Sequence, residues 1–259
     1  MGAAARDLVV YVGASGAFGE AVVDRLVGEG HSVIAVARDT GRLSALAERY
    51  AGSVRVCTAD LSTDESVPAL RDSISAALAG GRSLRAVVHG PGVAVAGGVR
   101  EVATSALLAA VDIKVGGLLR LVRAADGFLG DGARIIAIAG HYGLEPTEYA
   151  AAAGVANAAL FNIVRQLSLA YGARGVTAHT IAPGPADTER LRRVAADRAA
   201  MAGITVDEVL ADMRRESSLG RLTSPAEVAW AVSTLLAPEA SVMTGSTLML
   251  DAGRRRGLP

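Results

Sequence analysis

Short apolar runs alternate with longer amphipathic segments along this chain. Each run is only a few residues long, which is typical of a strand that is buried on both faces of a sheet. We predict seven strands, at residues 8–12, 32–37, 54–58, 84–89, 133–139, 175–182 and 246–250.

The segments between these runs have helical spacing. In the first of them, Phe18, Ala21, Val22 and Leu26 fall on one face of a helix. We predict helices at 17–28, 40–50, 63–79, 104–125, 147–172 and 225–236, and two short helices within 187–215. This alternation predicts an α/β chain with a single-domain, doubly wound Rossmann fold, in which helices cover both faces of a seven-stranded parallel sheet.

We expect this one domain to span residues 1–259, with residues 187–218 as a substrate lid. The 187–218 segment interrupts the alternation beside the carboxyl edge of the sheet, where ligands bind in such folds. A pair of solvated surface helices explains the same pattern. If the segment is a lid, some of its arginines could face an anionic substrate, whereas in solvated helices they would lie in water. These arginines are Arg190, Arg192, Arg193 and Arg198.

Composition narrows the class of protein. The chain of 259 residues is 51% hydrophobic and 20% charged, which favours a large buried core. Its formal net charge is zero, so we expect no nucleic-acid partner. No apolar run reaches the length of a membrane span, and the one cysteine, Cys57, fits a reducing cytoplasm. We predict no metal site.

A glycine-rich loop joins the first predicted strand to the first predicted helix. Glycines in this context allow a tight turn and a close approach to a pyrophosphate, which the helix N-terminus stabilises. A plain tight turn is the alternative. We expect a dinucleotide to contact Gly13, Ser15, Gly16, Ala17, Phe18 and Gly19.

The ends of the second and third strands suggest which dinucleotide binds. An NAD site commonly has an acidic residue near the end of the second strand, whereas this chain has Arg38. Arginine can bind a 2′-phosphate, so NADP(H) is favoured over NAD(H). The alternative is a surface salt bridge from Arg38 to Asp39 or Glu48. Asp60 and Leu61 are placed at the adenine, although Asp60 could instead cap the next helix.

These motifs resemble the short-chain dehydrogenase/reductase family over essentially the whole chain. Residues 13–19 are similar to its TGxxxGxG loop, with Val12 in place of threonine, and Ala59-Asp60-Leu61 is similar to its adenine-pocket motif. Residues 183–188, PGPADT, resemble its PGxxxT segment. The resemblance implies that the nicotinamide half of the cofactor contacts Gly90, Asn157, Pro183, Gly184 and Thr188.

The family usually transfers a hydride with a serine, a tyrosine, a lysine and an asparagine. Counting from the motifs places Gly140 at the serine position, Ala153 at the tyrosine, Asn157 at the lysine and Lys114 at the asparagine. The resemblance therefore implies an atypical member that lacks all four residues. Alanine cannot donate a proton, so another group must do so if the chain reduces carbonyls.

Four residues near this gap are candidates for the missing chemistry. Lys114 is the single lysine among 26 Lys and Arg residues, and apolar neighbours would lower its pKa. Tyr149 precedes the vacant tyrosine position by four residues, and His141 and Tyr142 follow the fifth strand. The alternative for the two tyrosines and the histidine is a role in packing. The alternative for the lysine is that its position is due to chance.

Three functions remain open from the sequence. The first is an NADP(H)-dependent oxidoreductase that acts on a small carbonyl or enone compound with a non-standard proton donor. The second is a non-redox elimination, isomerisation or cyclisation that uses Lys114. The third is a catalytically silent, cofactor-binding subunit. We expect a small-molecule substrate and a homo-dimer or homo-tetramer, with a hetero-oligomer as the alternative.

Overall fold

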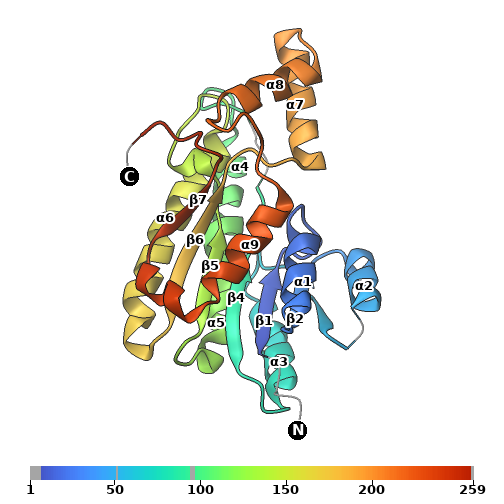
Figure 1. Cartoon of the computed structure of the whole chain (residues 1–259), viewed down its shortest axis with the longest axis vertical. Coiled ribbons are helices and arrows are strands. Elements are labelled where there is room, and N and C mark those ends of the chain that lie inside the picture. Colours follow the sequence, from blue (N-terminus) through green and yellow to red (C-terminus); the bar gives the residue numbers. More distant parts are fainter. Residues whose placement is uncertain (1–6, 51, 94–96, 258–259) are drawn as a thin grey trace.

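Seven parallel strands form one sheet in the computed structural model, which describes residues 7–50, 52–93 and 97–257. The strand order is β3-β2-β1-β4-β5-β6-β7 (Figure 1). Successive strands are therefore added on one side of β1 up to β3, and on its other side from β4 onward. The strands are β1 (Leu8–Val12), β2 (Ser32–Ala37), β3 (Val54–Thr58), β4 (Leu84–His89), β5 (Arg134–Ile138), β6 (Thr177–Pro183) and β7 (Thr247–Leu250). The predicted doubly wound Rossmann fold is confirmed.

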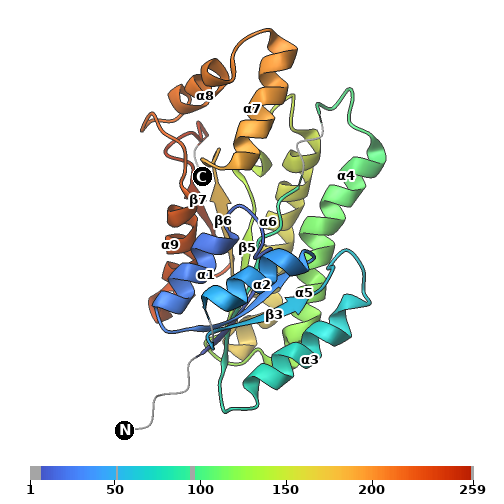
Figure 2. The same cartoon turned by 90° about the vertical axis from the view of Figure 1, so that its right-hand side faces the viewer.

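Helices cover both faces of the sheet, as Figure 2 shows. One face carries α1 (Gly19–Gly28), α2 (Thr40–Arg49) and α9 (Pro225–Leu235). The other carries α3 (Ser66–Leu78), α4 (Thr104–Val111), α5 (Gly117–Ala125) and α6 (Ala151–Tyr171). Alternate strand residues enter opposite cores, so Val9 packs with α1 while Val10 packs with α3. This explains why the strands read as continuous apolar runs.

Two further helices stand beyond the carboxyl ends of the strands (Figure 1). They are α7 (Glu189–Ala202) and α8 (Val206–Arg215), and they pack on each other through their own apolar cluster, which includes Ala195, Leu210 and Met213. Thr188 caps α7, and Thr205 caps α8 with a capping box. The two short helices predicted within 187–215 are therefore present.

The helix predicted for 104–125 is interrupted by one π-helical turn, η1 (Asp112–Gly116). The backbone N–H of Gly117 bonds to the carbonyl oxygen of Asp112, five residues earlier. Gly116 leaves room for the ion pair between Arg120 and Asp112, because a Cβ at this position would lie 2.7 Å from Nη1 of Arg120.

The helix predicted to begin at residue 147 begins at Ala151. The N–H of Ala151, at the start of α6, donates to the carbonyl oxygen of Gly97 in a distant loop at 3.2 Å. Tyr149 consequently lies in a turn before α6 and not on the helix. In the described ranges, no helix is both long and apolar enough to cross a membrane.

Candidate active site

The glycine loop turns tightly against the end of β4. Gly13 has φ +93°, and a Cβ on it would lie 3.1 Å from the backbone of Gly90 and Pro91. A Cβ on Gly19 would overlap the carbonyl oxygen of Ala14. Both glycines are therefore required by close backbone approach, which is the geometry expected of a dinucleotide loop.

Backbone N–H groups remain available in this loop at the N-terminus of α1. Gly16 donates to Gly13 O at 2.9 Å, and Gly19 donates to Gly16 O at 3.0 Å. Within the described part of the chain, the N–H groups of Ser15, Ala17 and Phe18 have no acceptor. Free N–H groups at a helix N-terminus attract an anion, so the loop fits a pyrophosphate.

Positive charge flanks the loop on the side of β2. Arg38 is exposed at the end of β2, and among the described residues it makes no ion pair with Asp39 or Glu48. Sequence reasoning missed Arg42, which donates from Nη1 to the carbonyl oxygen of Ser15 at 3.3 Å. Its position on α2, facing back to the loop, was not visible from the periodicity.

Asp60 and Leu61 lie in the turn after β3. The carboxylate of Asp60 accepts from the N–H of Ser62 at 3.0 Å. This backbone bond, with a smaller contribution from Arg38, lowers the pKa of Asp60. The helix-cap alternative is wrong, because α3 begins at Ser66 and its cap position is Glu65.

Lys114 lies in the π-helical turn, with its amine buried against the end of β5. Its side chain is 3% exposed, and Nζ donates to the carbonyl oxygen of Ile138 at 2.7 Å. Burial, assisted by the positive charge of Arg190, lowers the pKa of Lys114 to about 7. The amine therefore exchanges between its charged and neutral forms near neutral pH.

His89 fastens this turn to β4. Its Nε2 lies 2.9 Å from the carbonyl oxygen of Ile113. The neighbouring N–H of Gly117 goes to Asp112, so the Ile113 oxygen is open to the imidazole. Burial lowers the pKa of His89 to about 3, so the ring is neutral and donates from Nε2. Its role in this geometry is to position the turn that carries Lys114.

The structure brings Gly140, Ala153 and Asn157 together. A Cβ on Gly140 would lie 3.0 Å from Nδ2 of Asn157, one turn after Ala153 on α6. Asn157 is 5% exposed, and its Oδ1 has no hydrogen-bond partner among the residues described. An unpaired buried oxygen is costly, so it is suited to accept from a ligand hydroxyl.

Ala153 belongs to a buried apolar cluster. It packs in a cluster with Val93, Ala110 and Ala156, with Ile113, Tyr142 and Tyr149 at its edge. The hydroxyls of Tyr142 and Tyr149 lie 3.0 Å apart, and the guanidinium of Arg198 lies 4.4 Å from the centre of the Tyr149 ring.

His141 and Tyr142 are less suited than Lys114 to exchange a proton at neutral pH. Burial, followed by the charge of Arg254, lowers the pKa of His141 to about 4, so its imidazole is neutral. Burial and the neighbouring Tyr149 raise the pKa of Tyr142. The phenol therefore stays protonated, and Lys114 has the pKa closest to neutrality of the three groups.

The segment after β6 lies at the same edge of the sheet. Gly184 donates to Leu250 O at 3.0 Å, and a Cβ on it would lie 2.9 Å from the backbone of Asp251. Pro183 ends β6, and its carbonyl accepts from His141. Thr188 caps α7 by accepting from Leu191 N, so one of its lone pairs is already used.

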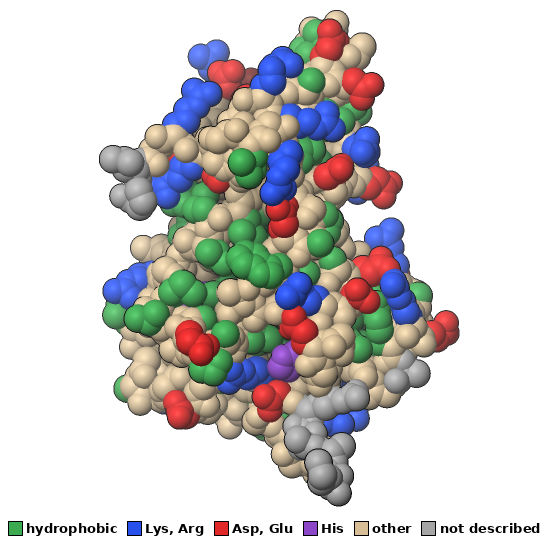
Figure 3. All heavy atoms as spheres, viewed as in Figure 1, with side chains coloured by type: hydrophobic (Ala, Val, Ile, Leu, Met, Phe, Trp, Pro, Cys, Tyr) green, Lys and Arg blue, Asp and Glu red, His purple; other side chains and the backbone are tan. Residues whose placement is uncertain are grey.

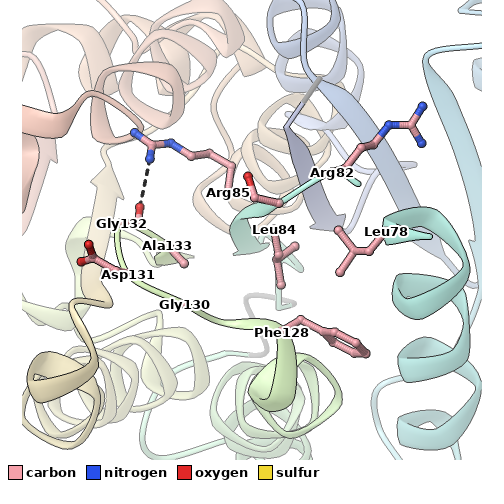
Figure 4. Close-up of a pocket in the computed structure, with 10 residues that line it drawn as sticks. Leu78, Arg82, Leu84, Arg85, Phe128, Gly130, Asp131, Gly132 and Ala133 are labelled. Atoms are coloured by element: carbon pink, nitrogen blue, oxygen red, sulfur yellow. Dashed lines mark hydrogen bonds between the residues drawn. The ribbon is translucent and has the colours of Figure 1, made fainter. Parts of the chain in front are cut away.

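A hollow and a pocket lie at different ends of the molecule. The outline in Figure 3 indents on the right between the part that holds α7 and α8 and the part that holds α1 and α2. The pocket in Figure 4 lies at the amino ends of β4 and β5, and there Arg85 Nη1 donates to Gly132 O at 3.1 Å. Its two arginines, Arg82 and Arg85, are already bonded to backbone, so the pocket offers no comparable chemistry. The described residues include no cluster of metal ligands.

The fold and the glycine loop define a Rossmann-type α/β protein. A family model described as enoyl-(acyl carrier protein) reductase matches residues 13–255. The chain is 30% identical over 251 residues to "(2S)-[(R)-hydroxy(phenyl)methyl]succinyl-CoA dehydrogenase subunit BbsC" of Thauera aromatica, covering 95% of this chain and 94% of that protein. The chain belongs to the short-chain dehydrogenase/reductase family, whose members bind NAD(P).

Other relatives agree with this assignment. The short-chain reductase protein NovJ of Streptomyces niveus is 28% identical over 261 residues, covering 96% of this chain and 94% of that protein. The L-sorbose reductase of Gluconobacter frateurii, solved with NADPH and L-sorbose, superposes with a TM-score of 0.88 at 23% identity and 98% coverage of both chains. At this identity the sorbose reductase supports the fold alone.

Proposed function

We propose that this chain is an NADP(H)-dependent oxidoreductase that reduces a small carbonyl or enone compound, with Lys114 as its proton donor. The single observation that carries the proposal is the buried amine of Lys114, held at the end of β5 with a pKa of about 7. General acid catalysis is most effective when the pKa of the donor is near the working pH.

The residues of the chain fit the cofactor. The loop of Gly13, Ser15, Gly16, Ala17, Phe18 and Gly19 offers its free N–H groups to the pyrophosphate, and Arg38 offers its guanidinium to a 2′-phosphate. We place the adenine beside Asp60 and Leu61. The buried Oδ1 of Asn157 would accept from a ribose hydroxyl, and Gly90, Pro183, Gly184 and Thr188 would border the nicotinamide half. When bound, the cofactor supplies or accepts a hydride.

Lys114 supplies the proton in this proposal. In its ammonium form it donates to the substrate oxygen, or to the α-carbon of an enone, as the substrate is reduced. The apolar cluster around Ala153 excludes water from the reacting atoms. Tyr142 keeps its phenol proton, the paired hydroxyls of Tyr142 and Tyr149 orient the substrate by hydrogen bonding, and neutral His141 holds the loop through Pro183.

The test combines cofactor binding with turnover. Purified full-length chain is titrated with NADPH and then assayed by nicotinamide absorbance against a panel of small ketones and enones. Lys114→Met and Lys114→Arg should bind NADPH as the wild type does and lose about 10²–10⁴-fold in turnover. Tyr149→Phe should retain most of the turnover. Full activity in both Lys114 variants, or no NADPH binding by the wild type, would contradict the proposal.

A second candidate is a cofactor-binding subunit without turnover of its own. It is favoured by the small residues Gly140 and Ala153 at two expected catalytic positions, and by the printed name of the Thauera aromatica relative, which is a dehydrogenase subunit. We propose a homo-oligomer in the cytoplasm for the first candidate and a hetero-oligomer for the second. Turnover by a purified homo-oligomer supports the first candidate, whereas NADPH binding without turnover on the panel supports the second.

A further inference from the structure

Two arginines of α7 turn inward, and the others turn outward. Arg192 is exposed and pairs with Asp187 at 3.3 Å, and Arg193 is also exposed. Arg190 and Arg198 are only half-exposed. The solvated-helix interpretation therefore describes one face of α7 and not the other.

Arg190 spans the space between α7 and the loop after β4. Its Nη1 occupies the position that a Cβ on Gly92 would take, and its Cζ lies 3.2 Å from that position. A Cβ at position 92 would displace the guanidinium from this position. In the described ranges, Arg190 donates no hydrogen bond and has no carboxylate partner.

The charged groups around Arg190 do not neutralise its positive charge. Arg190 and Arg193 repel, and Arg190 also acts on Lys114, so the Arg190 and Lys114 side chains share one electrostatic environment. Two carboxylates at this edge of the sheet, Asp251 and Glu145, are already used. Asp251 accepts from the N–H groups of Gly253 and Arg255 at 3.0 and 2.9 Å.

The second carboxylate, Glu145, is held by the C-terminal segment. It lies 3.7 Å from Nε of Arg255 and accepts from Gly257 N at 3.2 Å. Arg254, which faces His141 and Tyr142, is itself paired with Glu216. A half-buried guanidinium without a counter-charge is unfavourable, so Arg190 is expected to bind an anion.

We propose that Arg190 binds a carboxylate of the substrate beside Lys114, so that the substrates are carbonyl or enone compounds bearing a carboxylate. This inference rests on the proposed function. The cofactor pyrophosphate is accounted for by the free N–H groups at the N-terminus of α1, above β1. Arg190 lies against Gly92 in the loop after β4, and its charge acts on the Lys114 amine, which is bonded to the end of β5.

Binding of the substrate carboxylate would also change the protonation of Lys114. A carboxylate on Arg190 would neutralise the charge that, after burial, lowers the pKa of Lys114. Lys114 would then gain a proton as the substrate binds, which prepares the ammonium form for donation.

The test compares acetoacetate with its neutral methyl ester. Binding of each to the full chain is measured by saturation-transfer NMR, with and without saturating NADP⁺, so that no reduction occurs. The wild type should bind acetoacetate at least about tenfold more tightly than the ester. Arg190→Gln should lose this preference, Arg190→Lys should keep part of it, and Arg192→Gln should keep all of it.

The outcomes separate the inference from the proposed function. Equal binding of the two probes by the wild type, no binding of acetoacetate, or an unchanged preference in Arg190→Gln would overturn the inference. If Arg190→Gln loses NADP⁺ affinity tenfold and the wild type does not distinguish the two probes, Arg190 binds a cofactor phosphate. That result would also overturn the inference. Failure of the wild type to bind NADP⁺ contradicts the proposed function alone, because the probes are also compared without nucleotide.

Discussion

The amine of Lys114 donates to the carbonyl oxygen of Ile138 at 2.7 Å, and this bond ties the π-helical turn to the carboxyl end of β5. An arginine could not replace it, because a guanidinium is larger and does not release its proton in a protein. The buried amine therefore combines a structural position with a pKa near neutrality.

The free energy of unfolding should depend on pH through Lys114. Its pKa is about 7 in the folded chain and about 10.4 in an unfolded chain. Between these values the unfolded state holds more protons, so stability rises with pH. Denaturant titrations at pH 7 and pH 9 should show a gain of about 2 kcal/mol in the wild type relative to Lys114→Met. Equal pH dependence in the two proteins would contradict a lowered pKa.

Removal of the His89 side chain should disturb the π-helical turn. His89→Ala leaves the Ile113 carbonyl unpaired and a cavity beside Gly117, so we expect a loss of about 2–4 kcal/mol in unfolding free energy. The single lysine should also react faster with trinitrobenzenesulfonate. The matched control is His31→Ala in the half-buried turn before β2, where no side-chain hydrogen bond is lost among the described residues, and we expect a smaller loss of about 0.5–1 kcal/mol. Equal effects at the two histidines would argue against the positioning role.

Alanine should weaken NADPH binding at one glycine of α1 and leave it unchanged at another. In Gly19→Ala the new Cβ overlaps Ala14 O, so the loop must move, and we expect at least about tenfold weaker NADPH binding and a loss of about 1–3 kcal/mol in stability. Gly28→Ala meets nothing within 4 Å and should leave binding unchanged. Fluorescence titration with NADPH measures both. Unaltered binding by Gly19→Ala would place the nucleotide elsewhere.

Charge reversal at Arg38 should change nucleotide preference. Arg38→Asp removes the proposed partner of the 2′-phosphate, so NADPH affinity should fall about 10–100-fold while NADH affinity is maintained. Arg55→Asp, on the exposed side of β3, is the control and should change neither affinity. A parallel loss for both nucleotides in Arg38→Asp would contradict a role in discriminating NADP(H).

The strands were predictable because each is a short apolar run bounded by turn residues. All seven predicted strands are present, and most bounds agree within one or two residues. The π-helical turn was not predictable, since the apolar spacing of Val111, Val115 and Leu118 is compatible with a continuous helix. What distinguishes the turn is the bond from His89 to Ile113, which joins residues that are 24 positions apart.

The candidate site was predictable only in part, for a similar reason. The position of the glycine loop follows from local sequence, because the turn and helix N-terminus are local structures. At the start of α6, by contrast, Ala151 donates to the distant Gly97, and Tyr149 lies in the turn before the helix. The guanidinium of Arg190 lies against Gly92, where a side chain would displace it. Neither contact has a signal in one sequence.

The most direct test of the account is an NMR titration of Lys114. Because the chain contains a single lysine, ¹³Cε-lysine labelling gives one side-chain signal that needs no assignment. The account predicts a titration midpoint near pH 7, a higher midpoint in Arg190→Gln, and a change in the signal when NADP⁺ binds. A midpoint near the ordinary value of about 10.4, with no response to the nucleotide, would contradict a buried amine at the cofactor site.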